Sequence, residues 1–311
     1  MKTSDLNTQI ATVAEARPEA RFDRRKFVRQ AGLFGLGAAA SGIVLATAPA
    51  AHAQQESWQE QQQDSAQSMD TVKEIFTAAL IAEDLASTFY YNALVGTVIQ
   101  DPNLAGPGGS ATDVKATGNL GNVEYVRAAL SEEISHASLF RSLLGIPEAA
   151  KDPVQTFYFP AGTFNTLAAF TGLLNALENA FIGAYLNAIQ EFAAKAAMVR
   201  SRRNENSGSN GDSGKYTAEQ LEYYAKVAAS IMGIECEHRV LGRVISNTNP
   251  ANNLCYEQTD GLNAVYNGPK SAVAALTPFL TPSTGMGYSL MEALDKQSSV
   301  SLPCTGAPPA Y

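Results

Sequence analysis

Apolar residues recur at the spacing of an α-helix in four long segments of the chain. The segments lie at about 71–94, 122–144, 165–200 and 217–245. Thr71 and Thr217 each stand three residues before a Glu or Gln, which is the capping-box pattern that begins a helix. Gly145 supplies a stop signal after the second segment. The pattern predicts an all-α chain built on four long helices.

Ionisable residues interrupt the apolar face of every segment. They are Glu83, Glu133, His136, Glu178, Glu235 and His238. A carboxylate that is buried without a partner costs several kcal/mol or becomes protonated. Lys and Arg are absent from these faces, so salt bridges do not supply the compensating charge. The pattern indicates that bound cations supply it.

The two histidines beyond His52 share one local pattern. His136 stands three residues after Glu133, and His238 stands three residues after Glu235. Residues three apart on a helix share one face and can reach a common ion. Carboxylate and imidazole donors without thiolates suit iron or manganese and disfavour structural zinc. Two divalent ions, two Fe or two Mn, would balance the four inward carboxylates.

Two further glutamates adjoin these pairs. Glu132 precedes Glu133, and Glu237 lies between Glu235 and His238. Adjacent helix positions point about 100° apart, so only one member of each set of neighbours can face inward. We expect Glu132 and Glu237 to lie behind the ligands or on the solvated surface.

The two halves of the chain echo each other. With Glu83 set against Glu178, Tyr90 falls on Tyr185, and the two Glu-x-x-His stretches also superpose. This echo predicts a pseudo-twofold bundle around one central site. For both tyrosines we favour core packing with a hydrogen-bonded hydroxyl over a redox role.

These residues carry a resemblance to the ferritin-like superfamily, and specifically to exported bacterial ferritin-like proteins related to desiccation-associated proteins. That bundle places one Glu on each of two helices and Glu-x-x-His on each of the other two. The resemblance covers about residues 70–246 and implies a ferritin-like four-helix bundle with one long crossover. It implies that Glu83 and Glu178 are terminal ligands and that Glu133 and Glu235 bridge. Each histidine would complete one metal.

The crossover and the C-terminal region have their own signals. Residues 146–164 form an apolar connection between the second and third helices, where such a crossover would run. Residues 247–311 read as an irregular C-terminal extension with a short helix near 289–296. No segment after residue 53 reads as apolar for long enough to span a bilayer.

The N-terminus resembles a twin-arginine export signal. Arg24 and Arg25 precede Phe27 and a weakly apolar run that ends at Ala51-His52-Ala53, a cleavage pattern. The run is short and rich in Gly and Ala, which disfavours a membrane anchor. We therefore expect a signal peptide over 1–53 and a linker over 54–69. The twin-arginine export machinery would be a partner, the location would be periplasmic or otherwise exported, and the mature chain would not insert into the membrane.

Charge and cysteines narrow the partners. The chain has 22 Lys and Arg against 30 Asp and Glu, a net charge of −8, and removal of the basic signal makes it more negative. Nucleic acid is an unlikely partner for such a chain, whereas metal cations suit it. The three cysteines form no C-x-x-C pair, and spacing alone does not decide whether Cys255 and Cys304 form a disulfide.

The function follows from the site rather than from the fold. One hypothesis is an exported oxidoreductase of ferroxidase, peroxidase or manganese-catalase type that handles O₂, H₂O₂ or Fe(II) under oxidative or desiccation stress. The alternative is a non-enzymatic protein that sequesters metal or has a structural role in stress protection. Storage in a ferritin-type cage is less favoured, because the C-terminal extension would complicate cage packing. The sequence does not decide whether the protein is an enzyme, and its oligomeric state, a homo-oligomer included, stays open.

Overall fold

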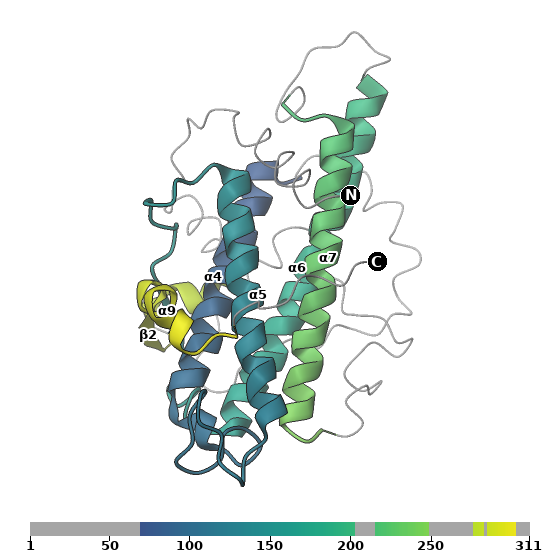
Figure 1. Ribbon diagram of the computed structural model, residues 1–311. Helices are drawn as coiled ribbons and strands as arrows, with labels where there is room; N and C mark the ends of the chain where they lie inside the picture. Colours follow the sequence, from purple (N-terminus) through teal and green to yellow (C-terminus); the bar gives the residue numbers. More distant parts are fainter. Residues whose placement is uncertain (1–68, 203–214, 249–275, 283–284, 303–311) are drawn as a thin grey trace, which may run out of the picture.

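The computed structural model describes four stretches of the chain, and its long helices form one bundle (Figure 1). The described residues are 69–202, 215–248, 276–282 and 285–302. The helices confirm the predicted all-α, four-helix architecture with one long crossover. The predicted export signal, Cys255 and Cys304 lie outside the described residues.

The helices begin and end where local chemistry directs them. Their bounds are α4 Val72–Val95, α5 Leu120–Leu144, α6 Leu167–Arg202 and α7 Ala218–Ile245. Thr71 and Thr217 form complete capping boxes with Glu74 and Gln220, as the sequence predicts. Gly145 ends α5 in the left-handed conformation, at φ 66°, where glycine is favoured.

The bundle consists of two helical pairs that are joined by the crossover. α4 packs mainly on α5, and α6 packs mainly on α7. In Figure 1 α4 runs down, α5 runs up, and the chain then returns along the bundle before α6 also runs up. α4 and α6 are therefore antiparallel, as are α5 and α7, which places corresponding residues of the two halves opposite each other.

The C-terminal segment closes over the crossover. β1 Thr156–Phe159 pairs antiparallel with β2 Met286–Ser289, and α9 Leu290–Lys296 packs against α4 (Figure 1). The single-turn helices are η2 Thr97–Gln100, η3 Thr277–Leu280 and η5 Gln297–Ser299. The sequence predicts α9 but not the strand pair. Each strand is four residues long, and the two are more than a hundred residues apart, so no local pattern marks their pairing.

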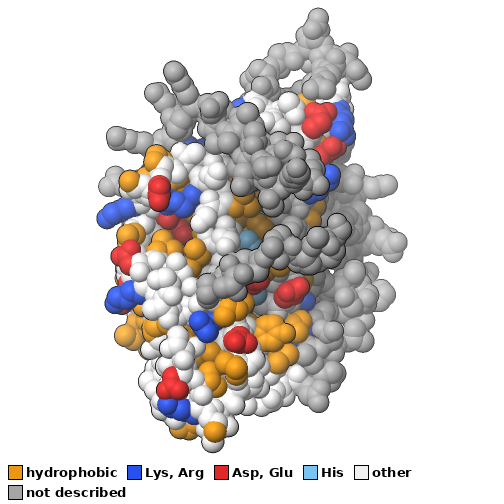
Figure 2. All heavy atoms as spheres, in the orientation of Figure 1, with side chains coloured by type: hydrophobic (Ala, Val, Ile, Leu, Met, Phe, Trp, Pro, Cys, Tyr) orange, Lys and Arg blue, Asp and Glu red, His pale blue; other side chains and the backbone are white. Residues whose placement is uncertain are grey.

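Polar residues at the middle of the bundle divide its apolar core. One apolar cluster includes Leu85, Phe89 and Phe170 and extends to the C-terminal segment. The other includes Phe76, Phe192 and Tyr224, at the opposite end. The six ionisable residues singled out by the sequence lie on the helices between these clusters. Figure 2 shows basic and acidic side chains scattered over one face, and a few histidine atoms are visible near the middle of that face.

The third helix is more apolar than we expected. Within the described residues, the stretch Leu167–Ser201 is long and apolar enough to cross a membrane, judged by length and composition alone. Half of its most apolar stretch is buried in the bundle. The expectation that no segment after residue 53 is apolar for long enough to span a bilayer is therefore wrong by this criterion. The physical reason is that α6 packs along α7 and buries its apolar side chains in both core clusters.

Candidate metal centre

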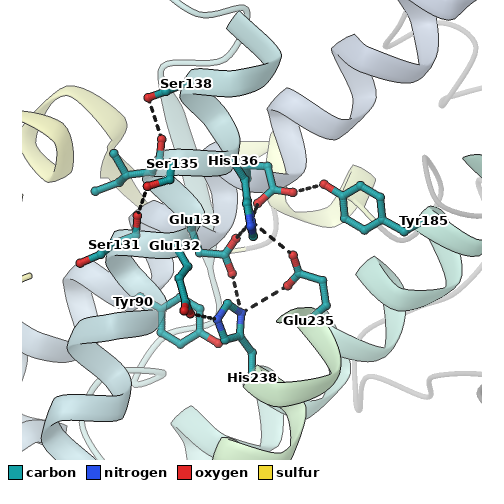
Figure 3. Close-up of polar contacts among 12 residues, drawn as sticks. Tyr90, Ser131, Glu132, Glu133, Ser135, His136, Ser138, Tyr185, Glu235 and His238 are labelled. Atoms are coloured by element: carbon teal, nitrogen blue, oxygen red, sulfur yellow. Dashed lines mark hydrogen bonds and ion pairs between the residues drawn. The ribbon is translucent and has the colours of Figure 1, made fainter. Parts of the chain in front are cut away.

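All six predicted site residues come together inside the bundle. Glu83 lies on α4, Glu133 and His136 on α5, Glu178 on α6, and Glu235 and His238 on α7. The four carboxyl side chains are between 0 and 2% exposed. Figure 3 shows the α5 and α7 side chains pointing toward one another across the bundle axis.

The six residues form two overlapping groups. Ligand atoms of Glu83, Glu133, His136 and Glu235 all lie within 4.8 Å of one another. Ligand atoms of Glu133, Glu178, Glu235 and His238 meet the same limit. Glu133 and Glu235 belong to both groups. This layout allows two metal ions side by side, each held by a terminal glutamate and a histidine, with two shared carboxylates between them.

His136 faces three carboxylates with one ring nitrogen. Its Nδ1 lies 3.3 Å from Glu83 Oε2, 3.6 Å from Glu133 Oε2 and 3.7 Å from Glu235 Oε1. The His136 side chain is 14% exposed, which makes it the most exposed of the six site residues. A cation placed among these atoms would replace repulsion between the carboxylates with attraction to each of them.

His238 is held from behind by Glu132. Its Nδ1 lies 3.0 Å from Glu133 Oε1 and 3.4 Å from Glu235 Oε2, while its Nε2 lies 2.8 Å from Glu132 Oε2 (Figure 3). A carboxylate behind a histidine fixes the ring and keeps its other nitrogen free for a metal. Glu132 therefore lies behind the ligands and Glu237 is exposed, in agreement with the expectation for these two neighbours.

Several atoms of the cluster lack hydrogen-bond partners, which is what a metal site requires. Both carboxyl oxygens of Glu133 and of Glu235 are buried without one, as are Glu178 Oε2 and His238 Nδ1. The contacts of His238 Nδ1 to the carboxylates are within ion-pair distance but lack hydrogen-bond geometry. Buried polar atoms are nearly always satisfied in proteins. Carboxylate and imidazole atoms orphaned in this way fit divalent iron or manganese.

The pKa values of three carboxyl groups and of both imidazoles in the cluster are raised. Burial, followed by the charge of a neighbouring carboxylate, raises the pKa of Glu133, Glu178 and Glu235. Burial by itself lowers the pKa of a histidine, but the charge of Glu83, the contact of the ring with Glu83 and the charge of Glu133 raise the pKa of His136 to about 11. Burial also lowers the pKa of His238, but the charge of Glu133 and the hydrogen bond with Glu132 outweigh burial and raise this pKa overall. Raised pKa values mean that these carboxyl and imidazole groups bind protons tightly. The same surroundings would attract metal cations.

Two tyrosines cross between the halves to hold the outer glutamates. Tyr90 on α4 donates to Glu178 Oε1 at 2.6 Å, and Tyr185 on α6 donates to Glu83 Oε1. Both rings are buried, in agreement with the predicted packing role. Burial, and then the adjacent glutamate, raises the pKa of each hydroxyl, which keeps it protonated as a donor. The reciprocal contacts show that the sequence echo corresponds to a pseudo-twofold arrangement.

Some buried ionisable residues near the centre carry little sequence signal. Asp84 is fully buried beside Glu83, and both of its carboxyl oxygens lack a hydrogen-bond partner. Arg243 is 1% exposed. The apolar residues that flank the pair Glu83-Asp84 in "IAEDLA" are the one sequence signal for the burial of Asp84. Nothing comparable marks Arg243.

One family model of known proteins matches part of the helical bundle. The family model of the ferritin-like domain matches residues 71–201, which include α4, α5 and nearly all of α6. Searches of curated proteins and of solved structures gave no match. The fourth helix and its Glu-x-x-His pair lie beyond the matched residues, yet α7 completes both groups. Residues 71–201 are therefore similar to a ferritin-like domain.

Proposed function

We propose that this chain is an exported dimetal-carboxylate protein that binds two Fe or two Mn ions and handles O₂, H₂O₂ or Fe(II) in the cell envelope under oxidative or desiccation stress. The observation that carries this proposal is the sharing of Glu133 and Glu235 by both ligand groups. A site for a single ion would not need six buried ligands arranged in two overlapping sets.

The side chains have distinct tasks in this proposal. Glu133 and Glu235 would hold both ions, and Glu83 and Glu178 would each hold one of them. Tyr185 and Tyr90 hold the outer glutamates by one oxygen and leave the other oxygen for the ion. Two redox-active ions, when bound, would supply the electron pair that reduction or disproportionation of an oxygen species requires. The surrounding apolar clusters exclude water, which strengthens each of these interactions.

Export through the twin-arginine pathway is part of the proposal. Its support is the sequence of residues 24–53, and the expected location is the periplasm or another exported compartment. The pathway carries folded proteins, so the site can be loaded before export. We expect neither nucleic acid nor inserted membrane as a partner of the mature chain, and a homo-oligomer is compatible with the proposal.

Elemental analysis and a paired substitution test the metal site. The purified chain should bind about two Fe or Mn ions, and excess metal should stabilise it by about 2.7 kcal/mol per site at a hundredfold excess over Kd. Glu133→Ala combined with His136→Ala should abolish both effects while circular dichroism still shows the helices. Glu237→Ala, at an exposed position on α7, is the control and should bind metal normally.

Turnover separates the two classes of function. Disproportionation of H₂O₂ or oxidation of Fe(II) by the loaded chain would identify an enzyme, and metal binding without turnover would identify sequestration. A wild-type chain without bound metal, or a double variant that binds as the wild type does, would contradict the proposed centre.

A further inference from the structure

An apolar cavity of about 70 Å³ adjoins one side of the centre. Its walls are mainly alanine and phenylalanine side chains from α4, α6 and α7. Ala82, which precedes Glu83, and the ring of Tyr185, which donates to Glu83, both line it. The cavity therefore reaches the residues directly behind one of the two ligand groups.

Polar groups gather away from the centre. Asp70, Asn187, Glu191 and Tyr224 also line the cavity, and the Tyr224 hydroxyl is buried without a hydrogen-bond partner. Glu191 lies thirteen residues beyond Glu178, about 20 Å along α6, and Tyr224 lies eleven residues before Glu235, about 16 Å along α7. Glu191 accepts a hydrogen bond from the backbone N–H of Asp70 at 3.0 Å. Close to the centre, the Tyr185 hydroxyl is already engaged with Glu83. The part of the cavity beside the centre thus offers an apolar environment.

Bulky aromatic side chains pack together at the pseudo-twofold counterpart of this cavity. Around Tyr90, Phe89 packs against Phe170 at 5.0 Å and against Phe159 and Phe164 at 5.5 Å. Small side chains such as Ala82 and Ala184 occupy the corresponding region beside Tyr185. The two sides of a nearly symmetric centre therefore differ in the residue before the tyrosine, which is Phe89 on one side and Ala184 on the other.

We propose that this cavity holds the apolar reactant of the centre, dioxygen, next to Tyr185. The inference rests on the proposed function and narrows it. The cavity is about half the volume of an engineered apolar cavity of about 150 Å³ that stays dry and binds xenon. H₂O₂ needs hydrogen-bond partners, which the alanine and phenylalanine side chains beside the centre do not provide, whereas dioxygen needs none.

Xenon is the probe, because it is small, apolar and unreactive. The metal-free full chain, with ¹³C-labelled alanine methyl groups, is titrated with dissolved xenon. The Ala82 methyl signal should shift and saturate. Ala184→Leu, which places a larger side chain in the cavity, should abolish this shift, and Ala188→Leu serves as a second filling variant one turn away. Ala193→Leu, the same change at an exposed position on α6, should leave it intact.

Reaction with the loaded chain then tests the reactant. Ala184→Leu should slow the reaction with dissolved O₂ at least tenfold and leave the reaction with added H₂O₂ within twofold of wild type. Absence of a saturable xenon shift in the wild type, its persistence in both filled variants, or an unchanged O₂ rate would overturn the inference. Metal affinity, measured on the same variants, distinguishes the failures: metal binding without xenon binding overturns only the cavity, and loss of metal binding in the wild type overturns the centre.

Discussion

Among single side chains, Tyr90 and Tyr185 show how closely the halves depend on each other. Each tyrosine lies seven residues after one outer glutamate and donates to the other one. A hydroxyl that donates to one carboxyl oxygen orients the other oxygen, so each tyrosine positions a ligand that comes from the opposite half. Partners behind metal ligands commonly affect affinity by about 10–100-fold.

Removing either hydroxyl should therefore weaken one of the two ions. Tyr185→Phe should lower the affinity of the ion held by Glu83, and Tyr90→Phe the affinity of the ion held by Glu178, each by about 10–100-fold. Titration calorimetry with Mn²⁺ should show one weakened binding step in each variant. Tyr125→Phe, at a tyrosine that is 61% exposed, is the control. Unchanged affinities in both buried variants would show that the hydroxyls only fill space.

A second residue-scale prediction concerns pH. Burial, followed by the charge of Asp70, raises the pKa of Glu191 to about 7 from 4.5, although Lys195 and the Asp70 N–H act in the opposite direction. The folded chain therefore binds this proton more tightly than the unfolded chain does. The resulting stability is present below about pH 4.5 and is lost as the pH rises to about 7.

Glu191→Gln removes this titration while keeping an oxygen that can accept from Asp70. The free energy of unfolding of the variant, relative to wild type, should rise by on the order of 2 kcal/mol between pH 4.5 and pH 8. Urea unfolding of both metal-free chains at several pH values measures the difference, in which the titration of other groups largely cancels. A difference that stays flat over this range would contradict the raised pKa.

At the scale of helices, α6 and α7 approach closely where Gly242 faces α6. A Cβ at this position would lie 2.9 Å from Leu174 Cδ2 and 3.0 Å from Asn175 Oδ1. Leu174 is fully buried, so it has little space into which to move. The absence of a side chain at Gly242 therefore allows the two helices to pack at this distance.

Gly242→Ala should destabilise the chain by about 1–3 kcal/mol, because overpacking forces neighbouring side chains from their preferred positions. Gly233→Ala on the same helix meets nothing within 4 Å and should be neutral or stabilise by about 0.5–1 kcal/mol. Urea unfolding of the two variants compares crowding with helix propensity directly. Similar effects of both substitutions would mean that α6 shifts to accept the methyl group.

The long helices could be predicted from the sequence, whereas contacts between distant segments could not. Helical periodicity and capping boxes at Thr71 and Thr217 act within a few residues, so they located the long helices to within a few positions. The pairing of β1 with β2 depends on contacts between distant segments, and no local pattern contains them. The six candidate ligands could be predicted because charge on an apolar helix face is exceptional. Glu191 could not, because its sequence neighbourhood resembles that of an ordinary surface carboxylate.

For the whole molecule, the C-terminal segment is part of the core rather than an appendage. Leu290 and Phe279 join the apolar cluster at one end of the bundle. Arg127 on α5 donates to the carbonyls of Val300 and Ser301, which fastens the end of the described chain to the bundle. An irregular extension was the expectation for this region, and its helix α9 was predicted, but its attachment to the crossover was not.

Each ligand group takes its atoms from three helices and from both halves of the chain. A ribosome must therefore release the sequence through residue 235 before the first group is complete, and through residue 238 before the second is. Isolated hairpins, proteolytic halves and nascent chains should all be poor scavengers of metal. Loading is consequently a late event in the life of the polypeptide, and the ion that it acquires depends on the compartment in which the last helix docks.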